Sequence, residues 1–516
     1  MEAATLRRGG PAAYLQSARG VLAERSRTFW VVVGLTLLGA VLRFATLGIQ
    51  SYHHDEVVTA ERVLQANFFD AMDVVRYSES APPLYYALAW VWTLFTGTGE
   101  VGLRSFSALA GVATIPVAYL IGAELRSRRT GLLAAALVAV NPMMLWYSQE
   151  GRAYALLTLF SAVSLLFCLR ALRNGQRRDF VWWGVFSGLA LATHYFAVFP
   201  ILVEAVLLAR RRRRASYAGL AITGGFGLLL LPLAVHQMSY GHAEWIGNMT
   251  LGHRLWETAA TFVTGETADI IGQPERPELA ILPLALCLAA FALLAWRGER
   301  EQRRAALVPL LIGAAAIGVP VLLAVLPGGV DFVLARNMMP ALVPLLVVVA
   351  IGLTLPGARR LGNAIAAVLL AYSLGFCILA SFSPDLQRPD WGAVASRLGE
   401  PQGPRATVTW TLAEAPLRYE LEAAGSSPAF MVRPSEKLGW MVHEVTFVSG
   451  GDVPPPAPKM LGPGFREVDR AQVGGLYMRR YKLQRPGLVP LRLRQLRNAR
   501  LDYRTNGVLL DGIGPG

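Results

Sequence analysis

Long apolar segments recur along the first three quarters of this chain, and they restrict its fold more than any other feature. Several approach the ~20 consecutive residues that a helix needs to cross a bilayer. The composition agrees, because 54% of the 516 residues are hydrophobic and the mean hydropathy is +0.41. The first segment, 29–47, is followed by no small-residue cleavage motif, so we expect a retained helix rather than a signal peptide. The chain is predicted to be a polytopic α-helical membrane protein.

The net charge of +14 is concentrated in short loops between the apolar segments. The positive-inside rule places short basic loops on the cytoplasmic side of a membrane. The arginine clusters therefore indicate topology, and no nucleic-acid partner is expected. The clusters run from Arg126 to Arg129, Arg173 to Arg178, Arg210 to Arg214, Arg297 to Arg304, and Arg359 to Arg360.

The basic loops, taken as cytoplasmic, give an expected topology for the whole chain. Residues 1–28 form a cytoplasmic N-terminus, and residues 29–382 form a membrane domain of about eleven spans. Outer loops are expected at 48–104 and 236–278. Helix 29–47 then delivers the first polar loop to the outer face.

Two segments need separate treatment. Residues 84–97 are apolar but too short for a full span, so they are predicted to form a re-entrant or interfacial helix. Residues 180–209 have basic residues at both ends, so both ends are expected to be cytoplasmic. This predicts a tight hairpin of two short spans, with its apex at Thr193 to Tyr195 near the outer face.

The character of the sequence changes after Ser383. Apolar runs shorten, proline and glycine multiply, and strand-like pieces appear at 406–411 and 445–448. A helix is expected from Asp390 to Leu398. Residues 383–516 are therefore predicted to form a soluble, extracytoplasmic α/β domain that ends in a basic tail.

Polar residues suited to chemistry gather on the predicted outer face. The run Ser51 to Glu56 holds two histidines followed by two carboxylates, where a membrane helix leaves the bilayer. Such acids and imidazoles are natural proton acceptors. The candidate catalytic residues are Asp55, as the base, and Glu56 beside it. The candidate donor-phosphate or substrate contacts are Arg43, His54, Arg104, Glu150, Arg152, His194, Tyr195 and Arg336.

Each candidate has a structural alternative. Asp55 and Glu56 fit the cap of a surface helix equally well, and Glu150 with Arg152 fits a structural ion pair. Arg43 is expected to extend toward lipid headgroups or to contact a lipid phosphate. A divalent metal also remains open, because the acids and histidines could supply ligands, although no metal-ligand spacing is present.

The chemistry that suits this face is transfer from an anionic, lipid-linked donor. Arginines hold a phosphate leaving group through charge-assisted hydrogen bonds. A carboxylate accepts the proton of an attacking hydroxyl. Gly-rich phosphate loops are absent from the sequence, which argues against ATP-driven work by this chain alone.

Several motifs resemble the bacterial family related to protein O-mannosyltransferases and aminoarabinose transferases, a glycosyltransferase family 39-like group. They are LGIQSYHHDEV at 47–57, APPLYY at 81–86, LRSFSALAGV at 103–112, YSQEGRAY at 147–154, THYF at 193–196 and Asp390-Trp391. Members are GT-C glycosyltransferases that use polyprenyl-phosphate sugars. The resemblance covers most of 29–209 and recurs in patches to about residue 398.

The resemblance implies roles for individual residues. The family's catalytic acid falls on Asp55, its functional loop arginine on Arg104, and its second acidic site near Glu150. The family often has His-Pro-Pro where this chain has Ala81-Pro-Pro, so no role carries over to Ala81. The resemblance names no counterpart for the C-terminal region.

These observations together predict an inverting glycosyltransferase of the plasma membrane. It would move a hexose or pentose from a polyprenyl-phosphate carrier to a hydroxyl on a glycan, lipid or protein, in contact with membrane lipids. Two other functions remain open. A transporter or flippase for a lipid-linked saccharide would show midplane acids and inverted repeats. A non-catalytic assembly partner in envelope synthesis would tolerate loss of Asp55.

Overall fold

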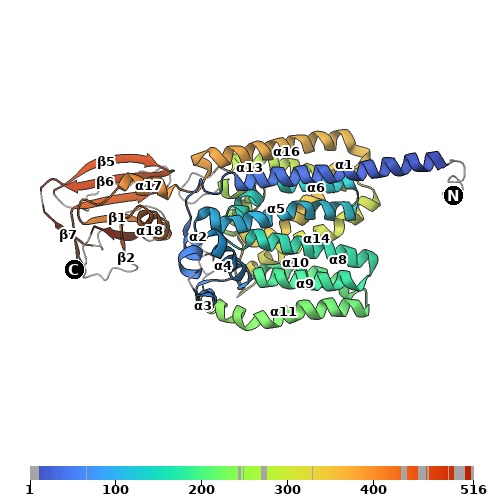
Figure 1. The fold of residues 1–516 in the computed structure, drawn as a ribbon, viewed down its shortest axis with the longest axis horizontal. Helices are drawn as coiled ribbons and strands as arrows, with labels where there is room; N and C mark the ends of the chain where they lie inside the picture. Colours follow the sequence, from blue (N-terminus) through green and yellow to red (C-terminus); the bar gives the residue numbers. More distant parts are fainter. Residues whose placement is uncertain are drawn as a thin grey trace.

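The computed structural model consists of a bundle of helices followed by a sheet with two covering helices (Figure 1). It describes residues 11–64, 67–241, 246–247, 249–268, 276–327, 329–431, 439–450, 461, 464–485, 487–492 and 506–512. The start of the expected N-terminal segment and most of the expected basic tail lie outside these residues. The bundle helices are α1 (Pro11–Phe44), α2 (His54–Val57), α3 (Phe68–Ser78), α4 (Leu84–Thr96), α5 (Glu100–Leu125), α6 (Arg128–Ala139), α7 (Pro142–Ser148), α8 (Tyr154–Asn174), α9 (Arg177–Thr193), α10 (Val198–Ala209), α11 (Arg214–Met238), α12 (Leu251–Thr264), α13 (Glu278–Arg297), α14 (Arg300–Val325), α15 (Leu342–Leu353) and α16 (Arg359–Phe382).

Eight helices of the described chain are long and apolar enough to cross a membrane. The bent pair α6 and α7 makes a ninth if it counts as one span. The chain is therefore a multi-pass membrane protein. The expected number of about eleven spans also counts α9 and α10, which have only 17 and 12 residues. Helix α4 has 13 residues, consistent with the expected short helix.

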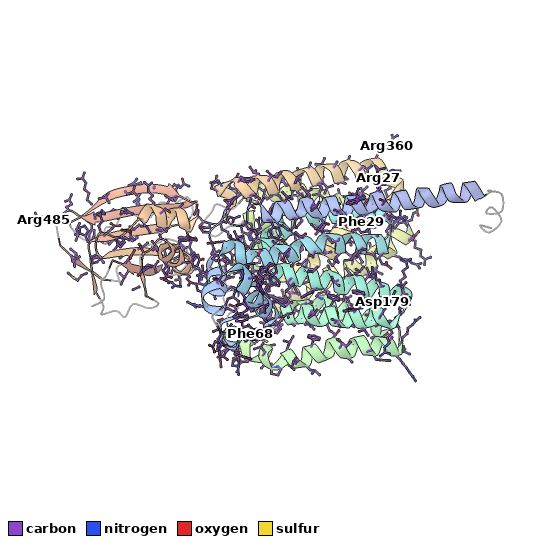
Figure 2. The ribbon with its side chains drawn as sticks, in the orientation of Figure 1. Arg27, Phe29, Phe68, Asp179, Arg360 and Arg485 are labelled. Atoms are coloured by element: carbon purple, nitrogen blue, oxygen red, sulfur yellow. The ribbon has the colours of Figure 1, made fainter. Side chains whose placement is uncertain are left out.

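The arginine clusters gather at one end of the bundle. Arg126 pairs with Glu301, and Arg129 donates to Asn363. Arg173 pairs with Glu124 at the end of α5. Figure 2 shows Arg27, Asp179 and Arg360 toward this end and Phe68 at the opposite one. We call the two ends the arginine-rich end and the site end, the latter carrying α2, α3 and α4 (Figure 1).

Helices α9 and α10 form the expected hairpin. Arg213, just after α10, donates to the carbonyl of Gly175, just before α9, so both feet of the hairpin lie at the arginine-rich end. The chain turns at His194, where a 3₁₀ turn spans Tyr195–Ala197. The turn therefore lies away from the arginine-rich end.

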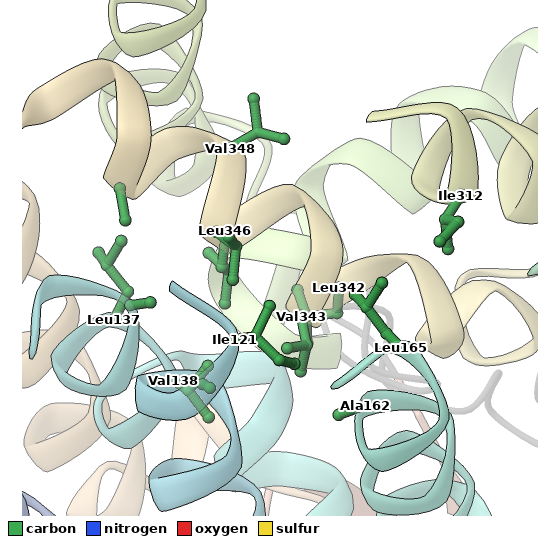
Figure 3. Packing of buried hydrophobic residues seen from close by; sticks show 14 of the residues in the cluster. Ile121, Leu137, Val138, Ala162, Leu165, Ile312, Leu342, Val343, Leu346 and Val348 are labelled. Atoms are coloured by element: carbon green, nitrogen blue, oxygen red, sulfur yellow. The ribbon is translucent and has the colours of Figure 1, made fainter. Parts of the chain in front are cut away.

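The core of the bundle is centred on α15, in which eleven of the twelve residues are buried. Its sequence is apolar on every side, which suits a helix enclosed by others rather than one facing lipid on one side. Figure 3 shows Leu342, Val343 and Leu346 of α15 close to Ile121 of α5 and Leu165 of α8. Packing of this kind fixes the helices that carry the site residues.

The sharp break between α6 and α7 has a local cause. Proline cannot donate a backbone hydrogen bond, and Pro142 begins α7, where Asn141 caps the helix by accepting from the Met144 amide at 2.9 Å. The two helices meet at 54°. The break leaves the last carbonyls of α6 without partners from their own helix.

The C-terminal part holds a six-stranded mixed sheet in the order β2-β8-β1-β4-β6-β5 and a two-stranded β3-β7 sheet. Only β1 and β4 pair in parallel among the described strands of the larger sheet. Trp391, Val394 and Leu417 on the two helices pack with the buried Trp410 and Leu509. The elements are α17 (Trp391–Leu398), α18 (Glu414–Ala423), β1 (Arg405–Trp410), β2 (Ala429–Met431), β3 (Gly439–Val442), β4 (Glu444–Ser449), β5 (Phe465–Val473), β6 (Leu476–Leu483), β7 (Val489–Arg492) and β8 (Asn506–Asp511).

Candidate active site at the end of the helical bundle

The site end gathers polar residues from distant parts of the sequence. They come from α2 and the loop before it, the start of α5, the loop between α7 and α8, the 3₁₀ turn Ala335–Ala341, and the segment that links α16 to α17. Most are buried. The carboxylates at this end differ in their contacts, because Glu56, Glu79 and Glu150 are enclosed by arginines, whereas Asp55 is part-exposed.

Glu56 is fully buried and its carboxylate is saturated by donors. Arg104 binds it in bidentate fashion, with Nε to Oε1 and Nη2 to Oε2 both at 2.8 Å. The Gly151 amide donates to Oε1 at 2.8 Å. Burial alone would raise the pKa of Glu56, but the charge and hydrogen bonds of Arg104 hold it well below its usual range. Glu56 is therefore a permanent anion that holds two loops together.

Arg104 has no N–H left for a ligand. Its remaining donors bind the carbonyls of Leu47, Gln50 and Ser51 at 2.9, 2.6 and 3.1 Å. A guanidinium has five N–H groups, and these three bonds with the two to Glu56 use all of them. The geometry thus gives Arg104 the role of closing the loop before α2, instead of the expected phosphate contact.

A second enclosed pair joins Arg152 and Glu79. Arg152 Nη2 lies 2.9 Å from Glu79 Oε2, and Tyr86 donates to the same oxygen at 2.6 Å. Arg152 Nη1 donates to Thr59 at 3.0 Å. The Arg152 pKa is raised well above its ordinary value, because the Glu79 charge outweighs burial. Arg152 is a fixed cation close to Asp55.

Asp55 differs from its neighbour in exposure and contacts. Its side chain is 30% exposed, and its nearest cations are Arg336 Nη1 at 3.6 Å and His53 Nε2 at 3.8 Å. Both distances exceed a hydrogen bond. Burial would raise the pKa of Asp55, but the charges of Arg152, His53 and Arg336 lower it far more. Asp55 is therefore an ionised carboxylate with room to accept a hydrogen bond.

Arg336 stands opposite Asp55, with a side chain that is 26% exposed. Among the described residues its ion-pair partner is the Asp55 carboxylate, and Tyr154 and Glu266 also lie near enough to act on its charge. The 3₁₀ turn Ala335–Ala341 positions it, and Asn337 anchors that turn by donating to the Phe332 carbonyl at 3.0 Å. Unlike Arg104, Arg336 keeps donors available for a bound anion.

Glu150 is buried against an arginine that the sequence analysis missed. Arg388 Nη2 donates to Glu150 Oε2 at 2.6 Å, and the Arg388 guanidinium covers the Trp146 ring at 4.5 Å. Burial raises the pKa of Glu150 despite the charge of Arg388. The signal available in the sequence was a basic residue two positions before Asp390, which was itself singled out.

The histidines occupy three different environments. His53 faces both Asp55 and Glu56 at ion-pair distance. His54 has a mostly buried ring whose Nδ1 has no hydrogen-bond partner, and burial lowers its pKa. His194 is buried with its ring against Tyr154, and burial with two nearby arginines lowers its pKa to about 3. His194 is therefore neutral at ordinary pH.

Two expected site residues have structural partners instead of a place beside Asp55. Arg43 is fully buried and donates to the Val138 and Ala139 carbonyls at 3.1 and 2.9 Å, the groups left free by the break after α6. It therefore does not extend to lipid headgroups. Tyr195 donates to Gln237 at 2.8 Å, and Gln237 in turn ties α11 to the carbonyl of Ala81.

A metal site is not formed by side chains of the described residues. No group of three or more histidine, cysteine, aspartate or glutamate residues within the described ranges could hold an ion. The acids at the site end are instead matched with arginines. The arrangement is suited to binding an anion beside an ionised carboxylate.

Comparison with known proteins identifies the fold. Residues 80–236 match the family described as dolichyl-phosphate-mannose-protein mannosyltransferase. The crystal structure of ArnT from Cupriavidus metallidurans in the apo state matches with a TM-score of 0.54 and 15% identity, covering 88% of this chain and 98% of that one. The same protein bound to undecaprenyl phosphate matches with a TM-score of 0.52, 15% identity and the same coverage. Comparison with curated protein sequences finds no match.

Proposed function

We propose that the chain is an inverting membrane glycosyltransferase of the GT-C superfamily, which is supported by its match to the mannosyltransferase family over residues 80–236 and by its similarity in fold to ArnT. It transfers a sugar from a polyprenyl-phosphate carrier to a hydroxyl group of a glycan, lipid or protein. The related ArnT structure holds undecaprenyl phosphate, which supports a donor of this class. The reaction takes place at the site end, on the extracytoplasmic side of the plasma membrane.

The observation that carries this proposal is the contrast between Asp55 and the enclosed acids around it. Glu56 and Glu150 are each bound by a buried arginine, and Glu79 is bound by the mostly buried Arg152. Asp55 is part-exposed, ionised and without a hydrogen bond to its carboxylate in the described structure. A general base must have a free lone pair within hydrogen-bond reach of the proton it removes, and among these acids Asp55 has the carboxylate with such lone pairs free.

The reaction follows as a single displacement. The acceptor hydroxyl gives its proton to Asp55 as its oxygen bonds to the anomeric carbon. The bond from that carbon to the phosphate oxygen breaks, and its electron pair leaves with the polyprenyl phosphate. One displacement inverts the anomeric configuration.

Arg336 is the best-placed side chain to hold the leaving phosphate. It is part-exposed, it faces Asp55, and it keeps unused donors. Arg152 adds positive potential nearby, but its own donors are directed at Glu79 and Thr59. Arg104 and Arg43 are enclosed by protein acceptors, so we do not assign them to the phosphate.

Placement of the site argues against the transporter alternative. Inverted-repeat transporters place their acids near the bilayer midplane. In the described structure the paired acids Glu56, Glu79 and Glu150 gather at the end of the bundle opposite the arginine clusters. With those clusters on the cytoplasmic side, the site faces outward.

Asp55→Asn tests the proposal. The amide keeps the size of the side chain but cannot accept the proton, so turnover with radiolabelled polyprenyl-phosphate sugar should fall by about 10²–10⁴. Binding of polyprenyl phosphate and the apparent melting temperature should stay near wild type. Asp73→Asn, on the exposed face of α3, is the matched control. Near-normal turnover of the Asp55→Asn variant would rule out the mechanism.

A further inference from the structure

The segment that links the membrane bundle to the C-terminal sheet lies directly against the loop that leads into α2, the helix of the proposed base Asp55. The Arg388 amide donates to the Gln50 side chain at 3.2 Å. Ser51 donates to Asp390 at 3.3 Å and accepts from the Gly392 amide at 3.1 Å. Asp390 at the same time caps α17 through the Ala393 amide. The first helix of the C-terminal part is therefore bonded to the loop that enters α2.

Arg388 extends from this segment into the site end. It is 7% exposed, and its guanidinium reaches three groups. Nη2 donates to Glu150 at 2.6 Å, Nη1 donates to the Gln149 carbonyl at 3.4 Å, and Nη1 lies 3.6 Å from Glu56. Arg388 thus carries the positive charge shared between two buried carboxylates.

One of these carboxylates lies in the same helix as Asp55, and the other lies in the loop bonded to that helix. Glu56 follows Asp55 in α2, and Glu150 lies in the loop whose Gly151 amide donates to Glu56. Glu150 has Arg388 as its recorded ion-pair partner in the described structure. Without Arg388, two buried carboxylates would face each other with one arginine fewer, and like charges in a poorly solvated space repel strongly.

A second contact ties the C-terminal part to the π-helical turn Val58–Val63, which continues α2. Arg418 of α18 pairs with Glu61, one turn after α2. The Tyr419 ring lies 5.4 Å from that of Tyr52, and Tyr52 lies under the Arg104 guanidinium. The C-terminal part therefore contacts the chain both before Asp55, at Ser51 and Tyr52, and after it, at Glu61.

We propose that Arg388 is a positioning residue that makes the geometry of Asp55 depend on docking of the C-terminal domain. The domain then contributes to catalysis itself, in addition to any contact with the acceptor. This inference rests on the proposed function for its effect on turnover. The structural part of the inference is that the order of residues 49–57 depends on Arg388. This can be measured without any reaction.

The experiment uses the full chain in nanodiscs with two readouts. Arg388→Ala should raise amide hydrogen exchange in peptides covering residues 49–57 and lower turnover by about tenfold or more. Arg388→Lys keeps the charge but loses the planar contacts of the guanidinium. Its amide exchange and its turnover should therefore lie between those of wild type and Arg388→Ala. Arg397→Ala, which removes an exposed ion pair with Asp469 on the same domain, is the matched control and should change neither readout.

A rescue variant separates positioning from general damage. Adding Glu150→Gln to Arg388→Ala removes the unpaired buried charge, so it should restore part of the exchange protection and part of the turnover. The proposal is wrong if Arg388→Ala leaves exchange of 49–57 at the wild-type level, whether or not turnover falls. If wild type transfers no sugar while Arg388→Ala still raises exchange, the proposed function fails and the coupling stands.

Discussion

Glu56→Gln should unfold the site, whereas Asp55→Asn should only stop the reaction. Glu56 Oε1 accepts from Arg104 Nε and from the Gly151 amide, and Oε2 accepts from Arg104 Nη2, all at 2.8 Å. A glutamine has one acceptor oxygen and one NH₂ group. Whichever way the amide turns, its NH₂ faces an N–H of Arg104, so at least one bond is lost.

The magnitude follows from the burial of the pair. Glu56 and Arg104 are 0% and 1% exposed, and breaking such a buried pair by removing one charge costs about 3–5 kcal/mol. At about 1.4 kcal/mol per tenfold change, the folding equilibrium drops by at least a hundredfold. Asp55→Asn loses no hydrogen bond and only a part-exposed ion pair at 3.6 Å, so it should cost less than Glu56→Gln.

The assay is thermal unfolding of purified protein as a function of pH. The pKa of Glu56 lies below its unfolded value, so its contribution to stability is complete above about pH 4.3 and is lost as pH falls toward the folded pKa. Wild type should therefore lose stability on acidification, and Glu56→Gln should start lower and lose less. A Glu56→Gln variant with the melting temperature of wild type at neutral pH would refute this reasoning.

Two further predictions concern the phosphate and the sidedness. Arg336→Ala should weaken binding of polyprenyl phosphate by more than tenfold with little loss of stability, because a charged hydrogen bond in a part-desolvated site contributes about 2–5 kcal/mol. Arg104→Ala should instead lower the melting temperature. Equal binding by wild type and Arg336→Ala would exclude the assignment of Arg336 to the phosphate. In a cysteine-free variant, a cysteine at the exposed Ser80 should react with an impermeant reagent added to intact cells and one at Gly357 should not, whereas labelling at 357 alone would invert the topology.

The arrangement of the membrane bundle followed largely from patterns in the sequence. Apolar length predicts spans because lipid offers no hydrogen bonds to the backbone, and the arginine clusters predict which loops share an end. The hairpin at 180–209 could be predicted because its two ends are both basic. The number of spans could not, since α9 and α10 are shorter than a bilayer crossing requires and only packing stabilises them.

The sequence by itself determined that acids, histidines and arginines would meet at one end of the bundle. It also singled out Asp55 and Glu56 as the candidate catalytic residues. It could not determine which of the two carboxylates is open, because they are adjacent and chemically alike. That depends on Arg104, which lies 48 residues from Glu56 along the chain and binds its carboxylate, and on Arg388, which lies 3.6 Å from the same carboxylate. An arginine's role depends on how many of its five donors the protein already uses, and only the tertiary structure brings those acceptors to it.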